Sequence, residues 1–461
     1  MRLRKILLIC LIANPFVLQA AGEPAPAKGC YVEAVDYKGW QAQQMSNHWV
    51  QLIIVPQNGG RLMQVNFAGH SYLFVNPELA GKYFPPSASR WFNYGGDKLW
   101  LLPEGNNDEQ HWVGNSDLLD DGPFSFRKLS EGDHCEIELI GQPDPQTGIQ
   151  FSRTIAVDAD SPQIHFHATM KNVSGHPVQW SMQSVSQYDT SGLNSPTPSA
   201  KLLSSFNHDF WTFAPANHSS SYLNRYHVRF GPAENPSVLV RDDGLFTVHY
   251  VHMAAELWLD SPEGWLAVVD GKSRYAMVER FQYEEAKRYP GKASVIFWTN
   301  GPEMRLSSEG VPSLSADSDA GPYYLEAELN SPMCRLRPGE SCSFETEWFP
   351  TRSGDEFHGV TDAGIVIHPV RATRLQNGKI KLLGAFGVLF SGRLVARLYN
   401  EHGALLGTTP LANVDPTETV SLETGLAPAE TAARLSIHLE DANGVDRGSL
   451  QEVRIASEDN H

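Results

Sequence analysis

Apolar and polar residues alternate along many short stretches of the chain, and turn residues separate these stretches. The clearest examples are 31–36, 49–55, 61–67, 124–129, 135–140, 150–157 and 163–171. Residues that alternate with a period of two have their successive side chains on opposite faces of a β-strand. Long helical periodicity is rare, whereas glycine (38) and proline (30) are frequent. The pattern predicts an all-β protein that contains a large antiparallel sandwich.

The segment 322–350 has the most regular pattern and predicts a hairpin of two strands with a Pro-Gly turn at 338–339. In 324–329, YLEAEL, one face of the strand is apolar, and the other carries an aromatic ring beside Glu326 and Glu328. Such an acidic and aromatic face suits a polyhydroxylated ligand. The alternative is that both carboxylates simply face water.

A second notable segment is 90–105, RWFNYGGDKLWLLPEG. Two consecutive glycines, Gly95 and Gly96, allow the backbone to bend and to approach another segment closely. Aromatic rings surround them, with Asn93 and Lys98 between the rings. A sugar presents apolar C–H faces and a hydroxyl rim, so this mixture is typical of a sugar site. An aromatic corner of the core with solvated charges is the alternative.

The N-terminus has the features of a cleaved secretory signal, which we assign to residues 1–21. A basic start precedes a mostly apolar run at 6–18, and small residues follow it. The run is too short to span a bilayer. We therefore expect a periplasmic or secreted protein that does not insert into the membrane after cleavage.

Export makes the four remaining cysteines candidates for disulfides. Four cysteines allow three pairings, and the sequence alone does not choose among them. We favour Cys334–Cys342 across the predicted turn and Cys30–Cys135 near the start of the mature chain. The spacing of these cysteines is unlike that of a zinc site, and we expect no metal.

The formal net charge is −17. Such an acidic surface repels phosphate backbones and anionic lipids, which argues against nucleic-acid and membrane-surface partners. The sequence has no phosphate-binding loop and no nucleophile-elbow pattern, and we expect no cofactor.

The last hundred residues differ from the rest, because tryptophan is absent after Trp348. Residues 351–362 are typical of a linker. Six strand candidates with Asn-Gly and similar turns follow, which predicts a small immunoglobulin-like sandwich at 363–461.

Several short motifs between residues 30 and 351 carry a family resemblance. They are Gly59-Gly60-Arg61 with Asn76-Pro77, the run GGDKLW at 95–100, Glu279-Arg280-Phe281 with Tyr289-Pro290, and Tyr324-Leu325-Glu326 followed by LRPGE at 336–340. With these motifs the chain resembles the galactose-mutarotase-like (aldose 1-epimerase-like) supersandwich superfamily and, within it, an uncharacterised bacterial domain family. The resemblance implies a supersandwich at 29–352.

The resemblance also implies site chemistry. In mutarotases a Leu-Glu pair on a late strand carries the general base, and this pair falls on Leu325-Glu326. The general acid of mutarotases is a histidine on a central strand. The matching segment here, 183–189, contains no histidine, and Val185 stands in that place.

Three hypotheses follow. The first is an exported carbohydrate-binding protein that binds a hexose or an oligosaccharide and lacks the usual acid histidine. The second is an active aldose 1-epimerase-type isomerase with Glu326 as general base and a different acid. The third is a non-catalytic structural envelope protein. The predicted cleft consists of Glu326 with Arg61, Asn93, Lys98, Trp100, Gln187, Asp189 and Arg280.

Overall fold

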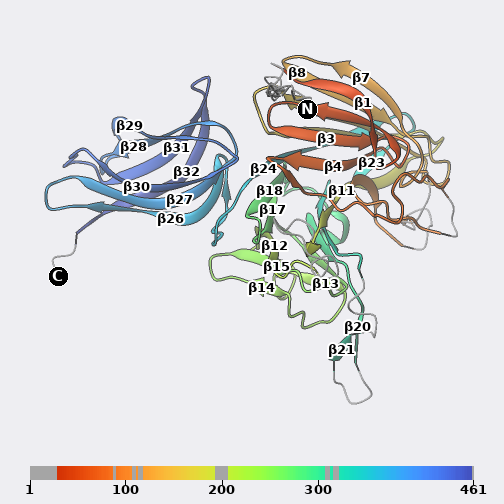
Figure 1. Cartoon of the computed structure of the whole chain (residues 1–461). Coiled ribbons are helices and arrows are strands. Elements are labelled where there is room, and N and C mark those ends of the chain that lie inside the picture. The colour runs from red at the N-terminus through yellow and green to blue at the C-terminus, as the bar shows by residue number, and fades with distance from the viewer. Residues whose placement is uncertain are drawn as a thin grey trace, which may run out of the picture.

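The computed structural model describes residues 29–86, 90–105, 111–112, 118–192, 206–306, 312–314 and 321–458. Strands dominate these residues (Figure 1), and the predicted all-β class is confirmed. The predicted signal peptide lies outside the described residues. Within them, no helix is long and apolar enough to cross a membrane.

The first sheet has twelve strands, and all its neighbouring strands pair antiparallel. Its order is β1 (Tyr31–Tyr37), β2 (Trp40–Ser46), β3 (Val50–Val55), β4 (Arg61–Phe67), β6 (Asp97–Leu102), β11 (Val178–Asp189), β22 (Tyr324–Asn330), β19 (Val295–Thr299), β16 (Ala255–Leu259) and β13 (His227–Phe230), with β5 (His70–Ser71) on β4 and β23 (Cys334–Leu336) on β11.

The second sheet has ten antiparallel strands. Its order is β14 (Val238–Val240), β15 (Leu245–His249), β12 (Phe210–Pro215), β17 (Trp265–Asp270), β18 (Tyr275–Phe281), β24 (Ser341–Arg352), β10 (Ile164–Asn172), β9 (Ile149–Asp158), β8 (His134–Ile140) and β7 (Ser125–Ser130). A small separate pair, β20 (Met304–Leu306) with β21 (Pro312–Leu314), projects away from both sheets (Figure 1).

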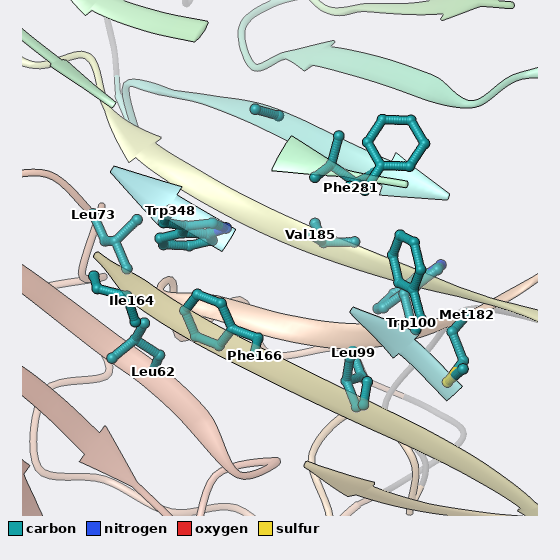
Figure 2. Close-up of a cluster of buried hydrophobic side chains, with 14 of the residues drawn as sticks. Leu62, Leu73, Leu99, Trp100, Ile164, Phe166, Met182, Val185, Phe281 and Trp348 are labelled. Atoms are coloured by element: carbon teal, nitrogen blue, oxygen red, sulfur yellow. The ribbon is translucent and has the colours of Figure 1, made fainter. Parts of the chain in front are cut away.

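The two large sheets enclose one apolar core. Figure 2 shows part of this core, where Phe166 and Trp348 of the ten-stranded sheet lie among side chains of the twelve-stranded sheet such as Leu62 and Leu99. The ring centres of Phe166 and Trp348 are 4.9 Å apart. Alternating side chains of both sheets therefore meet in the middle, as in a sandwich.

The predicted hairpin at 322–350 is wrong in one respect. β22 pairs with β11 and β19, whereas β24 pairs with β10 and β18 in the other sheet. The Pro-Gly turn instead connects the short β23 to β24. The apolar faces of β22 and β24 approach the same core from opposite sides, which a paired hairpin could not do.

Both predicted cysteine pairs are formed, with Cα–Cα distances of 5.8 Å for Cys30–Cys135 and 6.6 Å for Cys334–Cys342. Cys30 directly precedes β1, and Cys135 lies in β8. The first pair thus joins the two large sheets near their edges.

A third sheet of eight strands forms the C-terminal part of the chain (blue in Figure 1). Its order is β29 (Leu405–Val414), β28 (Gly392–Tyr399), β31 (Arg434–Asp441), β32 (Asp446–Ser457), β26 (Gly364–Arg374), β27 (Ile380–Val388) and β30 (Thr419–Leu426), with β25 (Val360–Thr361) on β26. The six predicted strands are present. β29, an edge strand with only one buried residue, was not predicted.

The C-terminal sheet packs on the outer face of the ten-stranded sheet. One apolar cluster contains residues of both, including Trp265 and Phe349 on one side and Ile365 on the other. The rings of Phe213 and Phe357 stack with centres 4.0 Å apart. The end of the first domain at residue 352 and the start of the second at residue 363 remain predictions from the sequence.

Candidate functional site

Polar and aromatic side chains gather on the outward face of the twelve-stranded sheet. A cavity of about 470 Å³ is present there. Six neighbouring strands, β6, β11, β22, β19, β16 and β13, contribute to it. We call it the central cavity, and its lining is Trp91, Lys98, Trp100, Leu102, Pro103, Glu104, Gln183, Val185, Arg229, Glu256, Trp258, Pro290, Gly291, Ile296, Trp298, Asn300, Tyr324, Glu326 and Glu328.

Strand alternation explains why these residues meet. On β22, Tyr324, Glu326 and Glu328 line the central cavity, whereas the intervening Leu325 and Ala327 are fully buried in the core. β6 likewise presents every second residue to the cavity, beginning with Lys98. Six strands in register therefore turn one set of alternate positions into a continuous wall.

Four tryptophans form the aromatic part of the wall, and carboxylates orient three of them. The Nε1 of Trp100 donates to Glu104 at 2.7 Å, and that of Trp258 donates to Glu256 at 2.5 Å. The Nε1 of Trp91 donates to Asp120 at 3.0 Å. Each of these three indoles is thus held at its edge.

Two carboxyl groups occupy the centre of the site. Glu328 is 7% exposed, and Glu326 is half-buried. Amide side chains of β11 hold both, since Gln187 Nε2 donates to Glu326 Oε1 at 2.5 Å and Gln183 donates to Glu328. These carboxylates therefore do not simply face bulk water.

Burial dominates the ionisation of this pair. Burial raises the pKa of Glu326, against the opposing effects of Lys98 and Gln187. Burial, followed by the adjacent charge of Glu326, raises the pKa of Glu328 well above its ordinary value. Burial thus favours the protonated form of both groups, and the arrangement matches two neighbouring carboxyls that share a proton.

Lys98 belongs to a buried ion-pair cluster under one side of the cavity. Its Nζ lies 3.0 Å from Asp120, which also accepts from Arg61 at 2.8 Å. Arg61 also pairs with Asp121 at 3.1 Å. The Lys98 ammonium lies 3.6 Å from the centre of the Trp100 ring. Burial lowers the pKa of Lys98, and Asp120 acts against this shift.

Three of the residues predicted from the sequence, Lys98, Trp100 and Glu326, line the central cavity. Gln187 lies behind Glu326 as its hydrogen-bond partner. Arg61 is fully buried in the ion-pair cluster and is not part of the lining.

Asn93 and Asp189 have local structural contacts. The Oδ1 of Asn93 accepts the Gly95 N–H at 3.1 Å, and Oδ1 of Asp189 accepts the Ser191 N–H at 2.8 Å. Neither side chain lines the central cavity.

The prediction that Arg280 belongs to the cleft is wrong. It lies on β18 of the other sheet, where its guanidinium is 5.1 Å from the centre of the Phe349 ring and donates to the carbonyl of Thr361. The Glu-Arg-Phe motif contributes Glu279 to the core, so alternation sends Arg280 outward, toward the C-terminal sheet.

Several lining residues were not predicted from the sequence, among them Glu104, Glu256, Trp258, Trp298 and Arg229. Part of the signal was available, because Glu256 and Trp258 alternate with leucines in ELWL, as Glu326 and Glu328 do in LEAEL. Recognising them as one site required the strand order β22-β19-β16, which is not local in sequence.

Within the described residues, no group of three or more histidine, cysteine, aspartate or glutamate side chains has the geometry to hold a metal ion. No family model matches the sequence, and no curated protein sequence matches it.

Several solved structures are similar. A TPR-domain containing protein from Parabacteroides distasonis aligns with 68% of this chain at 13% identity and a TM-score of 0.45, and the alignment covers 47% of that protein. A galactose mutarotase-like protein from Clostridium acetobutylicum aligns with 71% of this chain and 100% of its own length at 10% identity and a TM-score of 0.43.

A galactose mutarotase-like protein from Lactobacillus casei aligns with 67% of this chain and 99% of its own length at 10% identity and a TM-score of 0.42. Galactose mutarotase-like proteins are among the solved structures to which this chain is similar.

Proposed function

We propose that this chain is an exported carbohydrate-binding protein whose ligand, a hexose or an oligosaccharide, occupies the central cavity. The observation that carries the proposal is the joint presence of four tryptophans and hydrogen-bonding carboxyl and amide groups on one sheet face. Indole faces match the apolar C–H faces of a pyranose, and fixed acceptors and donors match its hydroxyl rim. The cavity of about 470 Å³ has a size typical of small-molecule sites.

Two disulfides support the export part of the proposal, because such bonds persist in oxidising compartments such as the periplasm or the exterior. The location of the protein can be checked directly by fractionating cells that express the full chain.

Sugar binding can be measured through tryptophan fluorescence during titration with a panel of hexoses and their oligosaccharides. We expect Trp298→Ala to weaken binding at least tenfold, because it removes one aromatic wall. Trp211→Ala is the matched control, since Trp211 is also half-buried but lies on the other sheet, stacked on His249. A panel without any binding sugar would contradict the proposal and favour a structural role in the envelope.

A second candidate function is an aldose 1-epimerase-type reaction, and the pairing of Glu326 with Glu328 favours it. Glu326 would take the proton from the anomeric hydroxyl while Glu328 gives its proton to the ring oxygen. The bond between the anomeric carbon and the ring oxygen then breaks, the carbonyl group rotates, and reclosure on its other face returns both protons. Each positioned proton transfer contributes roughly 10²–10⁴-fold.

Exchange NMR of anomer interconversion distinguishes catalysis from binding alone. A catalytic site predicts that wild type accelerates exchange and that Glu326→Gln and Glu328→Gln each abolish the acceleration while sugar still binds. Equal exchange rates with and without wild-type protein, at sugar concentrations that saturate the fluorescence change, would leave only the binding function.

A further inference from the structure

We infer that the preferred ligand of the central cavity is cationic, namely an amino sugar or a short oligomer that contains one. This inference rests on the proposed carbohydrate site and specifies the chemical class of the sugar. The combination of an acidic lining with indole faces carries it.

The charges of the cavity do not balance. Four carboxyl side chains line it, Glu104, Glu256, Glu326 and Glu328, against one lysine and one arginine. The lysine is already neutralised in the ion-pair cluster through Asp120. Arg229 is exposed, as is Glu104, and the four carboxyl groups outnumber the two basic side chains of the lining.

The cavity already binds one ammonium group in this manner. The Nζ of Lys98 lies 3.6 Å from the centre of the Trp100 ring and 3.0 Å from an Asp120 oxygen. An ammonium between an indole face and a carboxylate gains both cation–π and ionic attraction. Trp258 with Glu256 forms a second indole–carboxylate pair on the opposite side of β22 in the sheet, and the Arg229 guanidinium lies 6.0 Å from the centre of that indole ring. No lysine or arginine salt bridge of Glu256 is found among the described residues.

An unfilled acceptor lies next to Glu326. The Oε1 of Gln187 is buried without a hydrogen-bond partner among the described residues, while Nε2 of the same amide donates to Glu326. Gln187 lies on the same face of β11 as Gln183 and Val185, which line the cavity. A buried acceptor without a donor is costly, but Gln187 is fully buried behind the lining, so a ligand N–H or O–H reaches it only when Glu326 moves aside.

The same lining disfavours acidic sugars. A uronate or a sugar phosphate would place a negative charge among the four carboxyl groups, where burial weakens screening by water. A neutral hexose would meet no such repulsion but would leave the excess negative charge uncompensated. The expected order of affinity is therefore amino sugar, neutral sugar, acidic sugar.

A matched set of ligands tests this order in the intact protein. We would titrate D-glucosamine, D-glucose, N-acetyl-D-glucosamine and D-glucuronate, together with the tetramers of the first three in β-1,4 linkage, at pH 6, where the free amine is protonated. We expect the amine to bind at least tenfold more tightly than its neutral counterparts and glucuronate to bind most weakly.

The outcomes separate the two proposals. If a neutral sugar binds as tightly as its amine, the inference fails and the carbohydrate site stands. If no member of the set binds, the inference fails, and the wider hexose panel decides whether the carbohydrate site stands.

A charge-removing variant provides a second test. Glu256→Gln keeps an acceptor for Trp258 but removes one negative charge, so glucosamine affinity should fall severalfold more than glucose affinity. Glu263→Gln is the matched control, because Glu263 accepts the Nε1 of Trp265 at 3.3 Å outside the central cavity. Equal losses for glucosamine and glucose in Glu256→Gln would show that charge is not recognised.

Proton release gives an independent readout. The groups that face the Glu326–Glu328 pair are Lys98 on β6, Gln183 and Gln187 on β11, Tyr324 on β22 and the rim residues Glu104, Arg229 and Glu256. A bound ammonium favours the ionised carboxyls, so glucosamine binding should release a proton and glucose binding should not. Calorimetry in two buffers of different ionisation enthalpy measures this, and proton uptake on glucosamine binding would contradict the placement of the amine beside this pair.

Discussion

At the residue scale, the protein keeps ionisable side chains in the core as well as in the cavity. Glu279 is fully buried between the two large sheets and accepts the hydroxyl of Tyr188 at 2.5 Å. Arg153 and Asp97 form an ion pair in the same region. Burial raises the pKa of Glu279 to about 8, and the Tyr188 hydroxyl acts against this shift.

This buried carboxyl predicts a pH-dependent stability. In the unfolded chain a glutamate loses its proton near pH 4.3, roughly its ordinary pKa, whereas folded Glu279 keeps it until about pH 8. The folded state binds more protons in this window, so stability falls as the pH rises through it. Wild type should lose about 3 kcal/mol more than Glu279→Gln between pH 5 and 8.

Urea unfolding at several pH values measures this difference, because the amide that replaces the carboxyl in Glu279→Gln has no proton to lose. The other buried carboxyls contribute equally to both proteins and cancel in the comparison. Identical pH profiles for the two proteins would show that Glu279 is already ionised in the folded state.

Residue-level prediction from sequence succeeded where the strand pattern alone determines the direction of a side chain. The alternation on β22 placed Glu326 and Glu328 on one face, and the structure places both in the central cavity. It failed for Arg280, because the sheet that a strand joins depends on contacts with distant segments.

At the scale of elements, the turn before β6 positions one side of the cavity. Gly95 and Gly96 have φ of +89° and +77°, in the region that favours glycine. A Cβ on Gly95 would lie 2.1 Å from the carbonyl oxygen of Phe74. The close approach predicted at these glycines is therefore to the backbone of Phe74. This contact fixes where β6 begins and so positions Lys98 and Trp100.

Alanine substitutions test the role of this turn. Gly95→Ala should destabilise the protein by about 3 kcal/mol, since about 1–2 kcal/mol of left-handed backbone strain adds to an overpacking cost of about 1–3 kcal/mol. Gly69→Ala is the matched control, because Gly69 has φ of +81° and no atom within 4 Å of the added Cβ. It should lose only about 1–2 kcal/mol. Equal losses in urea unfolding would mean that the contact with Phe74 is easily relieved.

Element prediction was accurate for strands with a regular period of two, such as β22 and β26. It also found the exposed edge strand β7, at 124–129, but it missed β2 and β29, and β29 contains Pro410. The strand order that assembles the central cavity has no local signal at all.

At the scale of the whole molecule, three sheets share two large apolar cores. The ten-stranded sheet takes part in both, since its inner face meets the twelve-stranded sheet and its outer face meets the C-terminal sheet. Polar contacts reinforce the second junction, where Arg241 donates to the carbonyl of Phe357 at 2.7 Å and Thr351 to that of Val388 at 2.6 Å.

The two disulfides should contribute unequally to overall stability. Cys30–Cys135 closes a loop of 105 residues and Cys334–Cys342 one of 8. Loop-closure entropy predicts a loss of about 5 kcal/mol for the double alanine variant of the first pair and about 2–3 kcal/mol for that of the second. Urea unfolding of both variants measures the difference, and a larger loss for the short loop would contradict an entropic origin.

The position of the central cavity on the outward side of a single sheet has a kinetic consequence. A ligand bound there touches side chains that project from paired strands and residues of the connections beside them, so it can enter and leave without separating the two layers of the sandwich. Exchange should then be rapid compared with any opening of the core. The residence time of the ligand would depend on the strength of its contacts with the indoles and carboxyls. Conditions that make the sandwich more rigid would leave this residence time almost unchanged.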